Sequence, residues 1–283
     1  MKDFLTPLER RTTEYVAEDL SPLNKTFGIL IPIFVYRTVD TLLVAAGAYF
    51  TRDMQYDGSV ISRAVASNSN LVTVIIKMIA LLVAAGLLIP TFKKEKPVII
   101  NREVKNKDAL SRTLSVVILG IASSIFFNIL FTITGITGMS ATYTEVANRQ
   151  FSFNIGLGIL IYGLLAPFTE ELVFRGIVYN RIRRNYGLIM GLIFSPLLFG
   201  AFHGNVVQMM YGFLMGLLIT WVYERFGSFI YPCIIHMCAN AIIYTLSSTR
   251  LREYIFNIPT LLISLVITVV VVIYIGALKK NES

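Results

Sequence analysis

Long apolar runs separated by short polar segments cover most of this 283-residue chain. A helix needs about 20 predominantly apolar residues to cross a bilayer, and eight runs approach or reach that length. The pattern therefore predicts an all-α fold, a polytopic transmembrane helical bundle of about eight spans. The predicted spans are residues 26–50, 71–92, 113–135, 153–174, 188–203, 206–223, 228–247 and 258–278.

The polar segments between these runs alternate in their content of Lys and Arg. If the N-terminus is cytoplasmic, 18 Lys and Arg fall in the inside segments and 5 in the outside segments. Cytoplasmic loops of membrane proteins carry an excess of basic residues, so the sequence predicts that both termini are cytoplasmic. The first run contains Arg37 and Asp40 and lacks a small-residue cleavage site, which favours a retained helix over a signal peptide.

Composition supports a membrane protein and excludes several other classes. Hydrophobic residues make up 55% of the chain and charged residues 15%, whereas a soluble domain carries about 25% charged residues. The net charge of +8 lies in the short loops, so we expect contact with membrane lipid and no nucleic-acid partner. Short loops favour a multi-pass protein of a prokaryotic plasma membrane. The oligomeric state is not indicated by the sequence.

A few ionisable residues lie inside the apolar runs, where each is a candidate for function because charge in hydrocarbon is costly. Glu170 and Glu171 are adjacent in one run, and both histidines of the chain, His203 and His236, lie in later runs. In the earlier spans, Arg37 and Asp40 are three residues apart, and we expect them to neutralise each other. Lys77 either pairs with Asp40 or extends towards the membrane surface.

Helical spacing predicts how the later groups meet. Residues four apart share a helix face, so Glu171 can pair with Arg175, and His236 shares a face with Asn240. If the chain turns near Gly187, Glu170 and His203 lie at nearly equal heights on two antiparallel helices, given a rise of 1.5 Å per residue. We therefore predict that Glu170, His203, His236 and Asn240 line one water-filled cavity.

Two forms of hydrolytic chemistry are compatible with these groups. A buried carboxylate facing an imidazole can activate water as a general base, with a second imidazole and a carboxamide stabilising an oxyanion. Alternatively, Glu170, His203 and His236 could ligate a zinc ion that keeps a water position open. The chain lacks the HExxH zinc signature, which slightly favours the metal-free form.

The spacing of these residues resembles the three motifs of the CPBP intramembrane protease family, which includes CAAX prenyl endopeptidases and the bacteriocin-processing and immunity (Abi) proteins. The motifs are Glu170-Glu171-x-x-x-Arg175, Phe199-x-x-x-His203 and His236-x-x-x-Asn240. The resemblance covers about residues 150–245. Together with the apolar runs, it predicts four segments. Residues 1–25 form a cytosolic amphipathic segment, 26–150 N-terminal transmembrane helices, 151–247 the catalytic core, and 248–283 a C-terminal helix and tail.

The resemblance implies an intramembrane endopeptidase that acts on a membrane-associated peptide or protein, as in CAAX processing or the maturation of bacteriocins and signal peptides. It implies catalytic roles for Glu170, Glu171, His203, His236 and Asn240, with support from Arg175 and Phe199. The family has been classed as metalloproteases, and a metal-free glutamate mechanism is also argued for it. Two other functions stay open: a non-catalytic immunity or scaffold protein, and a proton-coupled transporter.

Overall fold

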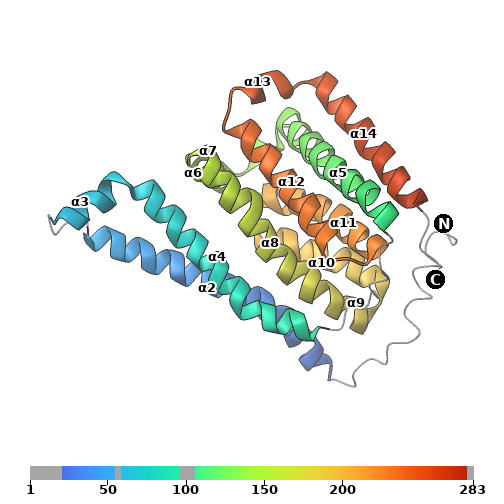
Figure 1. The fold of residues 1–283 in the computed structure, drawn as a ribbon, viewed down its shortest axis with the longest axis horizontal. Coiled ribbons are helices and arrows are strands. Elements are labelled where there is room, and N and C mark those ends of the chain that lie inside the picture. Colours follow the sequence, from blue (N-terminus) through green and yellow to red (C-terminus); the bar gives the residue numbers. More distant parts are fainter. Residues whose placement is uncertain (1–20, 55–58, 96–105, 279–283) are drawn as a thin grey trace.

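The computed structural model describes residues 21–54, 59–95 and 106–278, and these residues are helical throughout, with no strand among them (Figure 1). The first helices are α2 (Pro22–Met54), α3 (Val60–Ser67), α4 (Ser69–Lys94) and α5 (Asn106–Ile133). Four short elements follow: η2 (Ile136–Met139), α6 (Ala141–Gln150), α7 (Ile155–Gly158) and the π-helical η3 (Ile159–Leu165). The remaining elements are α8 (Ala166–Glu171), the π-helical η4 (Leu172–Tyr179), α9 (Asn180–Tyr186), α10 (Leu188–Phe202), α11 (Val206–Phe226), α12 (Ile230–Ser247), α13 (Leu251–Ile255) and α14 (Ile258–Ala277).

The all-α bundle predicted from the apolar runs is confirmed. Seven helices in the described part of the chain are long and apolar enough to cross a membrane. The predicted fifth span is α10, which has 15 residues. At 1.5 Å per residue it is about 22 Å long, shorter than the roughly 30 Å of a hydrocarbon core, so it is not one of these seven. Of the predicted N-terminal segment 1–25, residues 1–20 lie outside the described residues.

One unusually long helix organises the molecule. Elements α7, η3, α8, η4 and α9 form a continuous helix from Ile155 to Tyr186. It ends at Gly187, whose φ of 91° is readily adopted by glycine. The turn expected near Gly187 is therefore present, and α10 folds back along η4 and α9. The division of the chain at residues 150 and 247 stays a prediction.

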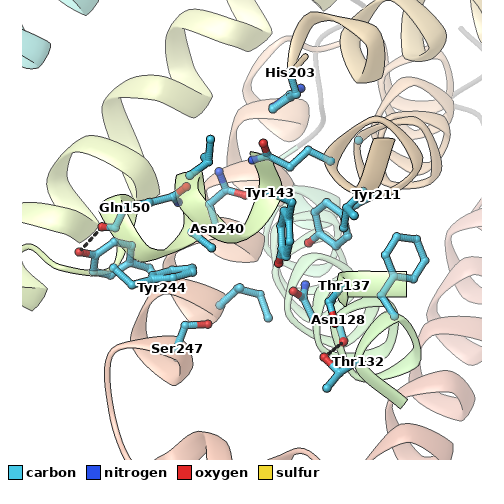
Figure 2. Close-up of a pocket in the computed structure, with 18 of the residues that line it drawn as sticks. Asn128, Thr132, Thr137, Tyr143, Gln150, His203, Tyr211, Asn240, Tyr244 and Ser247 are labelled. Carbon is cyan, nitrogen blue, oxygen red and sulfur yellow. Dashed lines mark hydrogen bonds between the residues drawn. The ribbon is translucent and has the colours of Figure 1, made fainter. Parts of the chain in front are cut away.

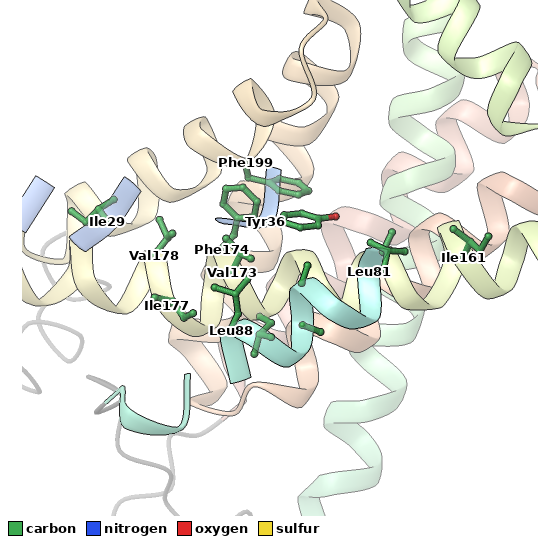
Figure 3. Close-up of a cluster of buried hydrophobic side chains, with 14 of the residues drawn as sticks. Ile29, Tyr36, Leu81, Leu88, Ile161, Val173, Phe174, Ile177, Val178 and Phe199 are labelled. Atoms are coloured by element: carbon green, nitrogen blue, oxygen red, sulfur yellow. The ribbon is translucent and has the colours of Figure 1, made fainter. Parts of the chain in front are cut away.

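The main hydrophobic core surrounds the middle of this long helix (Figure 3). Side chains of η4, including Val173, Phe174 and Ile177, pack against α2 and α4. In Figure 1, α2, α3 and α4 form a hairpin that extends away from the remaining helices. On the opposite side, α5 packs against α12 and α14.

Glycines allow close contacts between α10, α11 and the long helix. A Cβ at Gly200 would meet the backbone of Met209, and one at Gly216 would lie 3.0 Å from Pro196 and 3.2 Å from a guanidinium nitrogen of Arg175. Small residues let helix backbones approach closely in membranes. The α10–α11 pair is thereby held tightly beside the helix that carries Glu170.

Candidate active site

Four polar side chains from two helices form a cluster at the centre of the bundle: Glu170, Glu171, Arg175 and His236, which we call the histidine cluster. Glu171 and Arg175 are fully buried, and the exposed fractions of Glu170 and His236 are 9% and 6%. A guanidinium nitrogen of Arg175 lies 2.9 Å from Glu171 Oε1, as the spacing of four residues predicts. The cluster places two adjacent carboxylates against one imidazole.

Arg175 is fixed by more than its carboxylate partner. It also donates to Thr220 Oγ1 at 3.3 Å and to the Gly216 carbonyl at 3.1 Å. The guanidinium carbon lies 4.8 Å from the centre of the Phe199 ring. Because Arg175 connects η4 to α10 and α11, it holds Glu171 in one orientation.

Glu171 in turn orients His236. His236 Nδ1 lies 2.7 Å from Glu171 Oε1. A carboxylate can only accept, so Nδ1 carries the proton in this contact. The other ring nitrogen, Nε2, then faces Glu170 Oε2 at 3.6 Å.

Glu170 is the least constrained member of the cluster. Its Oε1 accepts a long hydrogen bond from the Tyr36 hydroxyl at 3.5 Å, and its Oε2 faces His236 Nε2. Tyr36 lies on α2, in a part of the chain where the sequence motifs gave no candidate. An aromatic residue in an apolar helix resembles ordinary core packing, so only its spatial position identifies it.

His203 and Asn240 lie near the cluster but make other contacts. His203 Nδ1 donates to the Phe199 carbonyl at 2.9 Å, since a carbonyl can only accept. Asn240 donates to the Tyr162 carbonyl at 3.1 Å. The Phe199 ring lies edge-on to both imidazoles, with ring centres 5.1 Å from His203 and 5.4 Å from His236. Phe199 therefore spaces the two histidines.

That Glu170 and His203 face each other across the hairpin of the long helix and α10 stays a prediction, because no direct bond joins them. Within the described residues, Glu170 contacts Tyr36 and His236, and His203 forms no hydrogen bond or ion pair with it. The prediction assumed a regular α-helix, but η3 and η4 are π-helical and flank Glu170 on both sides. A π-turn widens the helix and rotates the residues beyond it.

A cavity of about 670 Å³ adjoins the cluster (Figure 2). Phe199, His203, His236 and Asn240 are among its lining residues. Glu170 is not, so three of the four groups expected to share a cavity do so. Figure 2 shows His203 at one end of this space and Ser247 and Thr132 at the other. His236 both lines the cavity and contacts Glu170, so it lies between them.

The outer wall of the cavity is formed by elements that the sequence pattern did not predict, η2, α6 and α13. The Tyr244 hydroxyl donates to the carbonyls of Gln150 and Phe153, at 3.1 and 3.3 Å, and so anchors this wall to α12. Burial raises the pKa of the Tyr143 hydroxyl on α6, against the opposing effect of Arg252. Tyr143 is therefore a neutral hydrogen-bonding group at the cavity wall at physiological pH.

A second buried polar cluster lies further along the same long helix and was missed from the sequence. We call it the arginine–glutamate cluster; its members are Tyr179, Asn180, Arg183, Tyr223 and Glu224, all nearly inaccessible. Arg183 pairs with Glu224 at 3.2 Å, and Tyr179 donates to the same carboxylate. Glu224 directly follows the apolar run 206–223, so the sequence pattern predicts that it lies in a loop.

The ionisable pairs of the first two spans also differ from expectation. Asp40 pairs with Lys77 at 2.5 Å, so the expected neutralisation of Asp40 by Arg37 was wrong. Arg37 instead lies over the Phe202 ring, 5.2 Å from its centre. Residues 37 and 40 project from different sides of α2, one towards α10 and the other towards α4.

The donors of the site do not fit a metal ion. Among the described residues, no group of three or more His, Cys, Asp and Glu side chains is placed to hold one. The ligand set Glu170, His203 and His236 is dispersed, because His203 contacts a backbone carbonyl and only His236 lies near Glu170.

Comparisons with known proteins show a similarity over the segment that holds the site. Residues 152–242 match the family model described as type II CAAX prenyl endopeptidase Rce1-like. An "Uncharacterized 24.3 kDa protein" of Escherichia coli is 35% identical over 91 residues, which cover 30% of this chain and 42% of that protein. The "Putative membrane peptidase YdiL" of Bacillus subtilis is 24% identical over 191 residues, which cover 64% of this chain and 73% of that protein.

A third relative, the "UPF0177 protein YxdF" of Lactococcus lactis, is 30% identical over 81 residues, which cover 28% of this chain and 44% of that protein. The chain thus spans less than half the length of two of these relatives. No solved structure matches it significantly. The matched segment contains the histidine cluster together with His203 and Asn240. Residues 152–242, which hold all three motifs, are therefore similar to the Rce1-like family model.

Proposed function

We propose that the chain is an intramembrane endopeptidase that hydrolyses a peptide bond of a membrane-associated peptide or protein. The observation that carries the proposal is the state of Glu170. It is a carboxylate in a membrane-embedded cluster, held only by long contacts at 3.5 and 3.6 Å and separated from a large cavity by one imidazole. A carboxylate with unfilled acceptor capacity can take a proton from water, which is the function of a general base.

The remaining groups have complementary roles in this proposal. Glu170 accepts a proton from a water that reaches it from the cavity past His236, and the resulting hydroxide attacks the carbonyl carbon of the substrate. His236, with a proton on each ring nitrogen, donates from Nε2 to the oxyanion that forms, and Asn240 donates from its carboxamide. The C–N bond then breaks, and the amine leaving group receives the proton held by Glu170. Water has been added across the bond, and Glu170 returns to its starting state.

Glu171, Arg175, His203 and Phe199 support these steps. Glu171 fixes the His236 ring through the 2.7 Å contact, and Arg175 fixes Glu171 at 2.9 Å. His203, whose Nδ1 is occupied by the Phe199 carbonyl, keeps Nε2 as an acceptor that positions water. The substrate class includes CAAX-like tails and bacteriocin or signal-peptide precursors. The bacterial relatives support a location in a prokaryotic plasma membrane.

Comparative peptidomics of membranes tests the proposal. We expect Glu170→Gln to remove a set of peptides that the wild-type protein generates, while the protein still inserts and folds. Glu145→Gln is the matched control, because Glu145 is an exposed carboxylate paired with Arg149 on α6. Identical peptide profiles for wild type and Glu170→Gln, at equal amounts of folded protein, would contradict an endopeptidase and favour the immunity or scaffold function.

A further inference from the structure

The cavity is confined to one end of the helical bundle. Its lining comes from the C-terminal ends of α5 and α12, the N-terminal half of α11, and the short elements α6 and α13. Exposure falls steadily from the outer lining to the inner lining. Thr144, Asn148 and Arg252 are exposed, whereas Phe199 and His236 are buried. The cavity therefore has its mouth at α6 and α13 and its floor at the histidine cluster.

Basic residues are concentrated at the opposite end of the bundle. The starts of α2 and α5 and the ends of α4, α9, α11 and α14 lie there. Lys93 and Lys94 are exposed at that end, and Glu95 connects Arg181 and Arg184 across α4 and α9 at 2.5 and 2.6 Å. This end is the one whose connecting segments hold most of the Lys and Arg of the sequence.

The structure changes the count of Lys and Arg on the two sides of the membrane. Arg175 and Arg183, which belong to the inside segments, are buried in the two polar clusters, so 16 of the 18 Lys and Arg of the inside segments of the sequence remain. The cavity end has 5, and one of them, Arg149, is paired with Glu145. Because the end richer in Lys and Arg faces the cytoplasm, the mouth of the cavity faces the other side of the membrane.

The lining also indicates what the cavity takes up. Carboxamides and hydroxyls recur from mouth to floor between apolar side chains such as Phe131, Met215 and Ile243, and the described lining contains no Asp or Glu. Among the lining residues are Asn128, Thr132, Tyr143, Asn148, Gln150 and Ser247. Such side chains donate and accept hydrogen bonds and suit the repeating N–H and C=O groups of a polypeptide. A lipid chain offers none of these groups.

We propose that the cavity opens on the extracytoplasmic face and takes a polar, unlipidated peptide segment presented from that face. The scissile bond then belongs to an exported peptide or to the outer segment of a membrane protein. A cytoplasmic prenylated tail would meet the basic end of the bundle, opposite the mouth of this cavity. This substrate class depends on the endopeptidase function proposed above, whereas the orientation of the cavity does not.

Cysteine labelling in intact cells tests the orientation. The native thiols, Cys233 and Cys238, are first replaced by Ala, and one cysteine is then introduced by Asn148→Cys at the mouth or Tyr186→Cys at the opposite end. We expect a membrane-impermeant maleimide to label Asn148→Cys in intact cells and Tyr186→Cys only after permeabilisation. The reverse pattern, with both sites reactive in permeabilised cells, overturns the proposed orientation.

The same labelled cells test the route of the substrate. Attachment of the bulky maleimide at residue 148 from outside should cause loss of the peptides that depend on Glu170, relative to the same variant before labelling. Complete labelling with undiminished peptide release overturns the outer route while leaving the orientation in place. If no peptide depends on Glu170, the function proposed above fails, and the labelling pattern still decides the orientation.

Discussion

Two buried polar clusters lie on the same long helix, and they differ in how completely their carboxylates are bonded. In the arginine–glutamate cluster, both oxygens of Glu224 have partners: Oε1 pairs with Arg183, and Oε2 accepts from Tyr179 and Arg183. In the histidine cluster, Glu170 has only long contacts, and Glu171 Oε2 has no hydrogen-bond partner among the described residues. We call the first cluster closed because its carboxylate is fully bonded, although Asn180 Oδ1 has no hydrogen-bond partner among the described residues. We call the second cluster open because its carboxylates keep acceptor capacity.

Position separates the clusters as well. The histidine cluster reaches the cavity through His236, whereas none of the five members of the arginine–glutamate cluster lines it. A buried ion pair that is fully bonded holds helices in register, and removal of one partner leaves an uncompensated charge. A carboxylate with spare acceptor capacity beside a cavity can instead exchange protons with a ligand. Charge alone therefore does not mark the site; incomplete bonding next to open space does.

The largest effect on stability should follow from opening the closed cluster. Glu224→Ala leaves Arg183 as a buried cation, and breaking a buried pair in this way costs about 3–5 kcal/mol. We expect a large drop in the midpoint of thermal unfolding in detergent, while the peptide yield per folded molecule is preserved. Glu145→Ala is the control, because loss of an exposed pair changes stability by about 1 kcal/mol or less.

Two results would contradict the structural role assigned to the arginine–glutamate cluster. If Glu224→Ala left the unfolding midpoint where Glu145→Ala leaves it, the arginine–glutamate cluster would not stabilise the bundle. If the yield per folded molecule fell as far as in Glu170→Gln, the cluster would belong to the chemistry, and the distinction between closed and open clusters would be wrong.

Much of the fold and part of the site follow from the sequence, because both depend on local periodicity. Apolar run lengths gave the spans, and a spacing of four gave the Glu171–Arg175 pair. Glu224 was missed because a carboxylate at the end of an apolar run has the same sequence pattern as a loop residue. Its burial depends on Arg183, 41 positions earlier in the chain, and no local pattern encodes such a contact.

The limits of prediction inside the site have a similar origin. The equal heights predicted for Glu170 and His203 required every residue from 170 to 203 to keep ideal helical geometry, and the π-helical η4 departs from that geometry. Tyr36 could not be found because it reaches Glu170 from 134 positions away. Sequence spacing therefore identified which residues gather, while the actual partners depended on helix irregularity and long-range packing.

Within the histidine cluster, Glu171→Gln should have the largest effect among the positioning residues. A carboxamide preserves the volume but removes the charged acceptor shared by Arg175 and His236. Hydrogen bonds to charged groups contribute about 1.5–3 kcal/mol, so we expect a loss of about 10- to 100-fold in kcat. Because Glu171 orients His236 rather than contacting the substrate, KM should change little, and steady-state kinetics on an identified peptide substrate measure both.

The matched variant for that measurement is Glu171→Asp, which keeps the charge on a shorter side chain. Partial recovery of kcat relative to Glu171→Gln is expected if the charged acceptor is what matters. A loss confined to KM in both variants would place Glu171 in substrate binding and remove its positioning role.

Tyr36→Phe should have a smaller effect. The Tyr36 hydroxyl is 3.5 Å from Glu170 Oε1, and a neutral hydrogen bond contributes about 0.5–1.5 kcal/mol. We expect kcat to fall by about 2- to 10-fold, with no loss of packing because the ring still stacks on Phe202. Tyr49→Phe, an exposed tyrosine on the same helix, is the control. Equal kcat values for the two variants would show that α2 does not act on Glu170.

The smallest expected effect is that of a metal chelator. The His236 imidazole lies between the carboxylates of Glu170 and Glu171. His203 instead donates to a backbone carbonyl, so the candidate ligands Glu170, His203 and His236 do not converge. Peptide release by the purified protein should therefore persist after dialysis against 1,10-phenanthroline, while a zinc protease treated in parallel loses activity. Loss of activity that zinc restores would mean that Glu170, His203 and His236 rearrange around a metal. In that case the ion would bind the carboxylate oxygens that have free acceptor sites in the present arrangement of the cluster.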